Sequence, residues 1–160
     1  MRMKKVLAAA LCLVLAVGMA ACGSEGGGSK NVEGTLTDLM AKIYETAAAE
    51  VEAPLILETP LDDDNKAYML GSADVTFTEG LASEAAIMTI PHSMVLIRVD
   101  EATDIEATKQ LIRDNVNPGK WICAWVEPDQ VIVDNIGNLI FLVMSKDAEV
   151  YHQSFLALAE

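Results

Sequence analysis

The sequence predicts an α+β domain with a mainly antiparallel sheet, in which an N-terminal helix precedes the order strand–strand–helix–three-strand meander–helix. Two observations predict this class. Apolar residues recur at helical spacing in residues 36–51 and 148–158, and a capping box marks a third helix between them. Short apolar runs joined by turn residues fill the rest, and the closing runs follow one another as a meander.

Length and charge limit the function classes. The chain has 160 residues, with 11 Lys and Arg against 24 Asp and Glu, and its formal net charge is −13. The length excludes a large barrel or a multi-domain enzyme. The negative charge argues against nucleic-acid binding, because phosphates attract an excess of Lys and Arg. Hydrophobic residues make up 52% of the chain, which is too many for a disordered protein.

The N-terminus has the three parts of a bacterial export signal. Arg2, Lys4 and Lys5 form a positive start, residues 6–17 are an apolar run, and residues 18–21 are mostly small. The run is shorter than the roughly 20 residues of a transmembrane helix. We therefore expect residues 1–21 to be a lipoprotein signal peptide.

Residues 19–22, Met-Ala-Ala-Cys, resemble the bacterial lipobox, with Met19 in the place usually held by Leu. The motif implies that Cys22 carries a lipid anchor and becomes the first residue of the mature protein. An ordinary secretory signal with an incidental Cys22 is the alternative. We expect residues 22–34 to hold the lipidated Cys and a flexible Gly/Ser tether, and residues 35–160 to form one α+β domain. This organisation places the protein on the extracellular face of the cell membrane.

The first helix is expected over residues 35–51. Thr35 and Asp38 resemble a capping box, and Pro54 excludes further helix. The apolar residues on one stripe of this helix are Leu36, Leu39, Met40, Ile43, Ala47 and Val51.

Residues 54–83 are the least readable part of the chain. Residues 55–57 are a short apolar run, residues 62–65 suit a turn or a helix start, and residues 67–70 suit one helical turn. Residues 75–78 alternate as a short strand does, with Gly80 closing it.

The pattern is clearer after residue 83. Residues 84–90 and 94–99 are expected as strands joined by a turn at 91–93. A capping box at residues 103–106 starts a helix that fades at Asn115, and the Asn-Pro-Gly at 117–119 stops it.

Three closing strands are expected at residues 120–126, 130–136 and 139–145, followed by a helix capped by Ser145. Gly137 and Asn138 fit a two-residue hairpin loop, which places Ile136, Asp134 and Ile132 opposite Leu139, Phe141 and Val143. Both faces of the last strand are apolar, as expected for a strand covered on both sides. The second face must then pack under residues 54–83 or bind a partner.

Few residues suit catalysis or metal binding. His92 is expected in a turn and His152 on a helix flank, too few ligands for zinc. Asp62, Asp63 and Asp64 invite a calcium hypothesis, but they lack the Gly and the distal Glu of an EF-hand loop, so a solvated turn is preferred. We expect no catalytic residue, cofactor or metal site, and Cys22 lipidation as the one modification.

The cysteine, the two tryptophans and the carboxylates of residues 121–134 each have a structural and a functional interpretation. Cys123 is expected to be a buried, inert core cysteine, and it is the only one left to the mature chain, so no intramolecular disulfide forms. Trp121 and Trp125 would share one face of a strand, either as core anchors or as a ligand platform. A carboxylate pair for glycoside hydrolysis, drawn from Glu127, Asp129 and Asp134, competes with a solvated turn.

Residues 80–155 resemble a family of small clostridial (Firmicutes) lipoproteins catalogued only as a domain of unknown function. The residues that carry the resemblance are 88–99, Trp121 and 133–144. The resemblance implies a strand, a helix, a short central segment, a hairpin around the Gly and a closing helix. Asn-Pro-Gly at 117–119 departs from the longer helix of many members. The family brings surface anchoring and no activity.

Together these features predict a membrane-anchored extracytoplasmic lipoprotein that serves as an interaction or accessory module of an envelope complex. The alternatives are a small-ligand or cation-binding lipoprotein and, less favoured, a small envelope hydrolase. An apolar surface patch would favour the first. A pocket with convergent polar groups and perturbed pKa values would favour the others.

Overall fold

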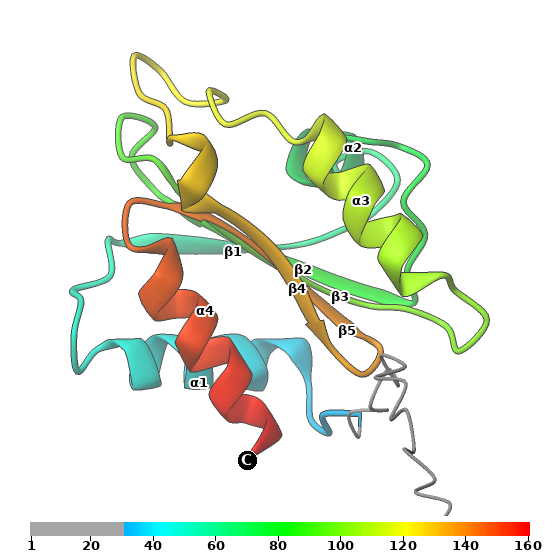
Figure 1. Ribbon diagram of the computed structural model, residues 1–160. Helices are drawn as coiled ribbons and strands as arrows, with labels where there is room; N and C mark the ends of the chain where they lie inside the picture. Colours follow the sequence, from blue (N-terminus) through cyan, green and yellow to red (C-terminus); the bar gives the residue numbers. More distant parts are fainter. Residues whose placement is uncertain (1–30) are drawn as a thin grey trace, which may run out of the picture.

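The computed structural model describes residues 31–160, which form a five-stranded antiparallel sheet with helices on both faces (Figure 1). The expected α+β class is confirmed. The predicted signal peptide, the predicted lipidation site Cys22 and most of the predicted tether lie outside the described residues.

Four α-helices and five strands make up the fold. The helices are α1 (Leu36–Ala47), α2 (Lys66–Leu70), α3 (Ile105–Asn115) and α4 (Ala148–Leu156). The strands are β1 (Ile56–Pro60), β2 (Glu79–Ala85), β3 (His92–Arg98), β4 (Val131–Ile136) and β5 (Leu139–Ser145). Short 3₁₀ turns occur at Pro128–Gln130 and Ala157–Ala159.

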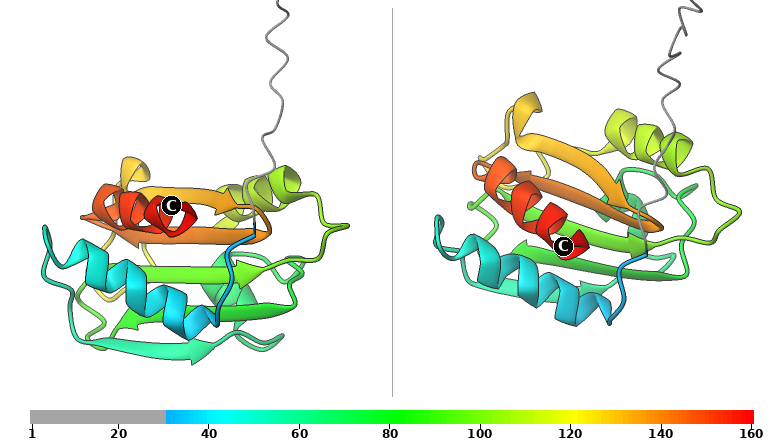
Figure 2. Two further views of the ribbon diagram at one scale, coloured as in Figure 1. Left: turned by 90° about the horizontal axis from the view of Figure 1, so that it is seen from below. Right: turned by 60° about the horizontal axis from the view of Figure 1, so that its bottom comes forward.

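The strand order is β1-β2-β3-β5-β4, so β1 and β4 are the two edges. The predicted hairpin is confirmed: Ile136 lies opposite Leu139, Asp134 opposite Phe141 and Ile132 opposite Val143. Gly137 has a φ of +54°, a left-handed conformation that glycine adopts without steric cost. Figure 2 shows the strands edge to edge, with β1 and β4 at opposite sides.

Helices α1 and α4 cover one face of the sheet. Thr35 begins α1, because its side chain accepts a hydrogen bond from the Asp38 N–H. The helix ends at Ala47, four residues earlier than expected. The buried side chains between these helices and the sheet include Met40, Ile43, Leu96, Phe141, Val143, Tyr151 and Phe155.

Helices α2 and α3 cover the other face together with residues 116–126. The buried residues there include Leu61, Leu70, Val75, Val95, Ile97, Ile112, Trp121, Ile140 and Leu142. Of the two alternatives for this face, packing under residues 54–83 is therefore the one realised. Asp104 caps α3, one residue later than expected, by accepting a hydrogen bond from the Ala107 N–H.

Two strand predictions in the first half were wrong. Residues 75–78 are not a strand, and β2 covers 79–85 rather than 84–90. Gly80 belongs to β2, where it lies opposite Ile97, and only glycine fits there, since a Cβ would lie 2.7 Å from the Leu61 Cβ. Local alternation could not distinguish a glycine that ends a strand from one that permits close packing.

The strand predicted at residues 120–126 was also wrong, because this segment is a loop. Cys123 has a φ of +55°, which interrupts an extended chain. Trp121 and Val126 are buried, while Ile122 and Trp125 are exposed. The segment therefore packs on the sheet through Trp121 and Val126, and the residues between them, Ile122 and Trp125, are left on the surface.

Candidate functional site at the apolar end of the sheet

The large hydrophobic side chains that are exposed in residues 31–160 come from neighbouring segments. They belong to the start of β1, to α2, to the β2–β3 loop and to residues 116–127. They are Leu55, Leu57, Tyr68, Ile87, Met88, Ile90, Ile122 and Trp125. We call these eight residues the apolar patch.

Backbone hydrogen bonds join the segments of the apolar patch. The Ala86 N–H donates to the Leu55 carbonyl, and the Ile122 N–H donates to the Met88 carbonyl. The two loops lie side by side at the upper left of Figure 1. Asn31 lies at the other end of the sheet, where its side chain accepts a hydrogen bond from the Asn138 N–H. The patch thus lies at the end remote from the first described residue.

Lys120 holds the 116–127 loop against the sheet. Its Nζ lies 2.6 Å from Glu84 Oε1 and donates to Ser93 Oγ at 3.1 Å, and its side chain is 1% exposed. Nζ also lies 4.9 Å from the Tyr68 ring centroid and 5.6 Å from that of Trp121. Burial lowers the pKa of Lys120, and the hydrogen bond and charge of Glu84 oppose this shift. Local sequence patterns do not indicate a role for Lys120, because its partner Glu84 is 36 positions away.

A cavity of about 380 Å³ opens at the same end, on the α1/α4 side. It is lined by Glu52, Ala53, Pro54, Leu55, Ile90, Pro91, His92, Ser145, Lys146, Asp147 and Tyr151. Leu55 and Ile90 belong both to the cavity wall and to the apolar patch. The cavity and the patch are therefore parts of one surface.

His92 forms the centre of a buried polar network beside this cavity. Its Nε2 lies 2.7 Å from the Tyr44 hydroxyl, which lies 2.9 Å from Ser83 Oγ. Its Nδ1 lies 3.2 Å from Ser145 Oγ. Burial lowers the pKa of His92 to about 4, with a smaller opposing effect of Asp147, so the ring is neutral at pH 7. His92 was predicted in a turn, but it is the first residue of β3.

Tyr151 has a hydroxyl without a partner. The residue is 1% exposed and lines the cavity, and its hydroxyl makes no hydrogen bond to any residue of 31–160. Burial raises its pKa to about 12, so it is a neutral donor. Within residues 31–160 the buried side-chain polar atom without a partner is Asn138 Oδ1, so the Tyr151 hydroxyl is accessible from the cavity, where water or an entering group can bond to it.

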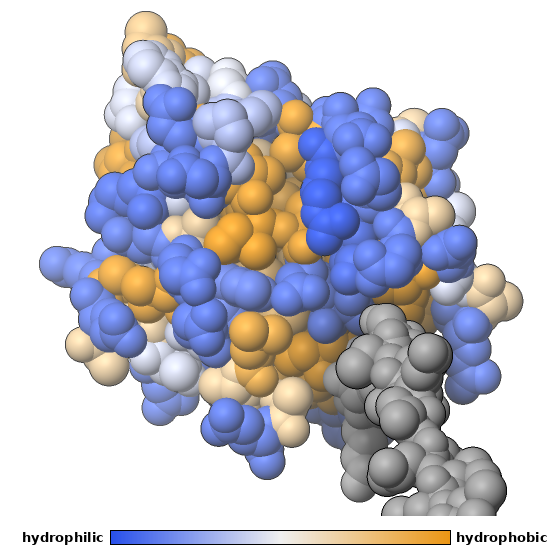
Figure 3. Space-filling view, in the orientation of Figure 1, coloured by the Kyte–Doolittle hydropathy of each residue, from blue (hydrophilic) through white to orange (hydrophobic). Residues whose placement is uncertain are grey.

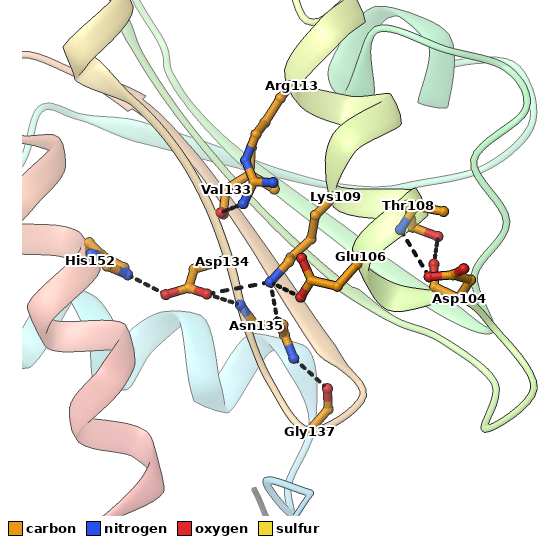
Figure 4. Close-up of polar contacts among 11 residues, drawn as sticks. Asp104, Glu106, Thr108, Lys109, Arg113, Val133, Asp134, Asn135, Gly137 and His152 are labelled. Atoms are coloured by element: carbon orange, nitrogen blue, oxygen red, sulfur yellow. Dashed lines mark hydrogen bonds and ion pairs between the residues drawn. The ribbon is translucent and has the colours of Figure 1, made fainter. Parts of the chain in front are cut away.

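A second polar cluster lies at the β4 edge (Figure 4). His152 Nε2 lies 2.8 Å from Asp134 Oδ2, and Lys109 Nζ lies 2.6 Å from both Asn135 Oδ1 and Glu106 Oε1. Burial raises the pKa of Asp134, but the hydrogen bonds from His152 and the Asn135 amide, with the charges of His152 and Lys109, outweigh it and lower the pKa. This cluster joins α3, β4 and α4 and opens into none of the cavities described.

The remaining candidates from the sequence are dispersed. Cys123 is exposed, so the expectation of a buried thiol was wrong, because the left-handed turn directs it out of the core. Trp121 is buried and Trp125 is 65% exposed, so they share no face. Glu127 accepts a hydrogen bond from Trp125 Nε1, whereas Asp134 pairs with His152, so the two carboxylates have different partners.

The acidic run at the start of α2 is a turn. Asp62 Oδ1 accepts hydrogen bonds from the N–H groups of Asp64 and Asn65, and Asp63 pairs with Lys66 at 2.7 Å. Residues 31–160 contain no cluster of three or more His, Cys, Asp or Glu that could hold a metal ion. In the same residues, every helix is too short or too polar to cross a membrane.

Comparison of the chain with protein-family models, curated proteins and solved structures finds no match. The resemblance to the clostridial lipoprotein family therefore stays a prediction.

Proposed function

We propose that this protein is a membrane-anchored extracytoplasmic lipoprotein that binds another envelope protein through the apolar patch. The observation that carries the proposal is the gathering of eight exposed large hydrophobic residues at one end of the sheet. Monomeric soluble proteins rarely leave such residues together, and contiguous apolar patches mark interaction sites.

The position of the patch favours a protein over the membrane itself. Asn31 and the β4–β5 turn lie at the opposite end of the sheet. A lipid on Cys22, with a tether that reaches under about 20 Å, brings that opposite end toward the bilayer. The patch then faces away from the membrane. The net charge of −13 also disfavours contact with anionic head groups.

Site-specific photocrosslinking in cells tests this proposal. A photoreactive amino acid replaces Trp125 in the patch or, as a control, Ala102, which is exposed in the loop before α3. We expect protein crosslinks from position 125 and none from 102, and Ile122→Asp in the first protein should remove them. Crosslinks to lipid from position 125, or equal crosslinks from both positions, would contradict the proposal.

A small-ligand binding lipoprotein is the second candidate, favoured by the unpartnered Tyr151 hydroxyl in the cavity wall. A ligand with an apolar body and one hydrogen-bond acceptor fits the mixture of Pro54, Leu55 and Ile90 with Tyr151. Native mass spectrometry of protein purified from its host tests this candidate. A bound small molecule that is lost in Tyr151→Phe would favour it, and an empty protein would count against it.

A further inference from the structure

The outer edge of β1 offers unpaired backbone groups. The Leu55 carbonyl and the Leu61 N–H bond to β2, and alternate residues of an antiparallel strand face the same neighbour. Ile56 and Glu58 therefore direct their N–H and C=O groups outward. Within residues 31–160 nothing pairs with them. The free edge ends at Pro60, which has no N–H and whose carbonyl accepts a hydrogen bond from Asn65 Nδ2 at 2.9 Å.

Side chains at this edge differ between the two faces of the sheet. Leu57, 62% exposed, lies on the α2/α3 face opposite Glu84, and Leu55, 76% exposed, lies just before β1, where it also lines the cavity. Glu58 lies on the α1/α4 face and is exposed. No helix lies beyond β1 in Figure 2. A strand added here would meet apolar groups on one face and a carboxylate on the other.

The negative charge around β1 determines which kind of added strand would bind there. Residues 43–65 contain seven Asp and Glu and no Lys or Arg. Two copies of the chain paired through β1 would bring two such acidic segments together, and like charges on paired strands are destabilising. A basic segment gains from the same field.

We propose that the β1 edge binds an extended segment of another protein as a sixth strand, with apolar residues over Leu55 and Leu57 alternating with Lys or Arg beside Glu58. This inference rests on the proposed function and names the chemistry of the partner. Main-chain hydrogen bonds supply affinity, and alternate side chains supply specificity.

The probe is a nine-residue synthetic peptide in which Val and Lys alternate, with both ends blocked. Amide hydrogen exchange followed by NMR locates binding. We expect at least about tenfold slower exchange at Ile56 and Glu58 when the peptide is bound. A peptide of the same composition with the Val residues in one block should bind about tenfold more weakly or not at all. N-methylation of every second amide of the alternating peptide should also abolish binding when the methylated amides are the ones that donate to β1.

Matched variants separate edge pairing from general attraction. Glu58→Lys should weaken binding by about tenfold. Glu101→Lys makes the same charge change in the exposed loop before α3, outside the acidic segment, and should stay within about twofold. Both positions are exposed, so thermal unfolding should show two folded variants. Ile56→Pro removes one outward N–H and is tolerated in an edge strand.

Three outcomes would overturn the inference. Equal binding of the block peptide, or equal losses in the two Lys variants, would mean charge attraction only. If a higher protein concentration alone slows amide exchange at Ile56 and Glu58, the strand that binds the β1 edge belongs to a second copy of this chain. Unchanged exchange at Ile56 and Glu58 would place the peptide elsewhere. If crosslinks from position 125 survive Glu58→Lys while the peptide fails, the proposed function stands and this inference falls.

Discussion

At the β4 edge, the outward Val133 carbonyl accepts a hydrogen bond from Arg113 at 2.7 Å, and the Asn135 N–H donates to Asp134 at 2.8 Å. At the β1 edge, the corresponding groups of Ile56 and Glu58 have no partner within residues 31–160. Figure 3 looks onto the β4 side, where hydrophilic residues separate hydrophobic areas. Side chains thus bond to outward backbone groups in the middle of β4, whereas in β1 they reach only the Pro60 carbonyl at its end.

Charged residues are present on both sides, so the difference lies in where they point. On the β4 side, Arg113 and Lys109 reach the edge from α3. On the β1 side, Lys120 points inward to Glu84 and fixes a loop of the apolar patch. The polar groups near β1 therefore support a surface instead of covering an edge.

The largest effect is expected from Lys120→Ala. It leaves Glu84, whose side chain is 22% exposed, without its partner, and loss of one member of a buried pair costs about 3 kcal/mol. Urea unfolding measures the loss. The double variant Lys120→Met with Glu84→Leu should recover most of it. A loss below about 0.5 kcal/mol in the single variant would mean that the pair does not hold the loop.

His92 is expected to make stability depend on pH. Its pKa is about 4 in the folded protein and about 6.5 when unfolded, so the unfolded state binds the proton first as pH falls. The contribution is complete above pH 6.5 and shrinks by about 3 kcal/mol on going to pH 4. Asp147 and Lys146 are the charged residues that act on it.

Urea unfolding at several pH values and NMR titration of the imidazole carbon-bound protons measure this effect. His152, on the β4 side, provides an internal comparison in the same spectra. A His92 ring that titrates near pH 6.5 in the folded protein would show that the network beside the cavity is open to water.

A smaller effect is expected from Arg113→Met. It removes the charged donor of the Val133 carbonyl at an exposed position, which costs about 1 kcal/mol. It also frees an edge carbonyl, so self-association at high concentration should rise, as measured by sedimentation. If neither the free energy of unfolding nor self-association changes, water satisfies the Val133 carbonyl as well as Arg113 does.

The smallest effect is expected at Asp134. Its lowered pKa means that its stabilising contribution is present above pH 3.8 and is lost as pH falls through the folded value. Because the side chain is 34% exposed, the contribution should stay below about 1 kcal/mol. Unfolding of Asp134→Asn at pH 7 and pH 3 measures it. A larger loss at pH 3 than at pH 7 would reverse the expected sign.

Several elements of the fold could be predicted from local patterns. The Gly137-Asn138 loop determined the register of β4 and β5, because a two-residue turn allows one pairing. Thr35 and the apolar stripe behind it determined α1 to within four residues. The turn at Asp62–Asn65 and the short α2 also followed from residue type.

Local patterns failed where a distant contact decided the conformation. Gly80 looked like the end of a strand, but it pairs with Ile97 inside β2, and its lack of a side chain allows close packing on Leu61. Residues 120–126 looked like a strand, but Lys120 and Trp121 are held by β2, β3 and α2, and Cys123 turns outward. Propensity describes a residue and its neighbours in sequence, and tertiary contacts outweigh it.

By itself, the sequence determined the α+β class, the closing hairpin, the acidic charge and the prediction of a lipid on Cys22. Only the tertiary structure brought residues 55–57, 86–91 and 116–127 together at one end of the sheet and placed Tyr151 beside His92. It also decided that β1 and β4 are edges and that side chains bond to the outward groups of Val133 and Asn135 in β4 but not to those of Ile56 and Glu58 in β1. The physical reason is that turns and helix caps are set by interactions over a few residues. An interaction surface instead depends on which distant segments pack together and on which backbone groups they leave unpaired.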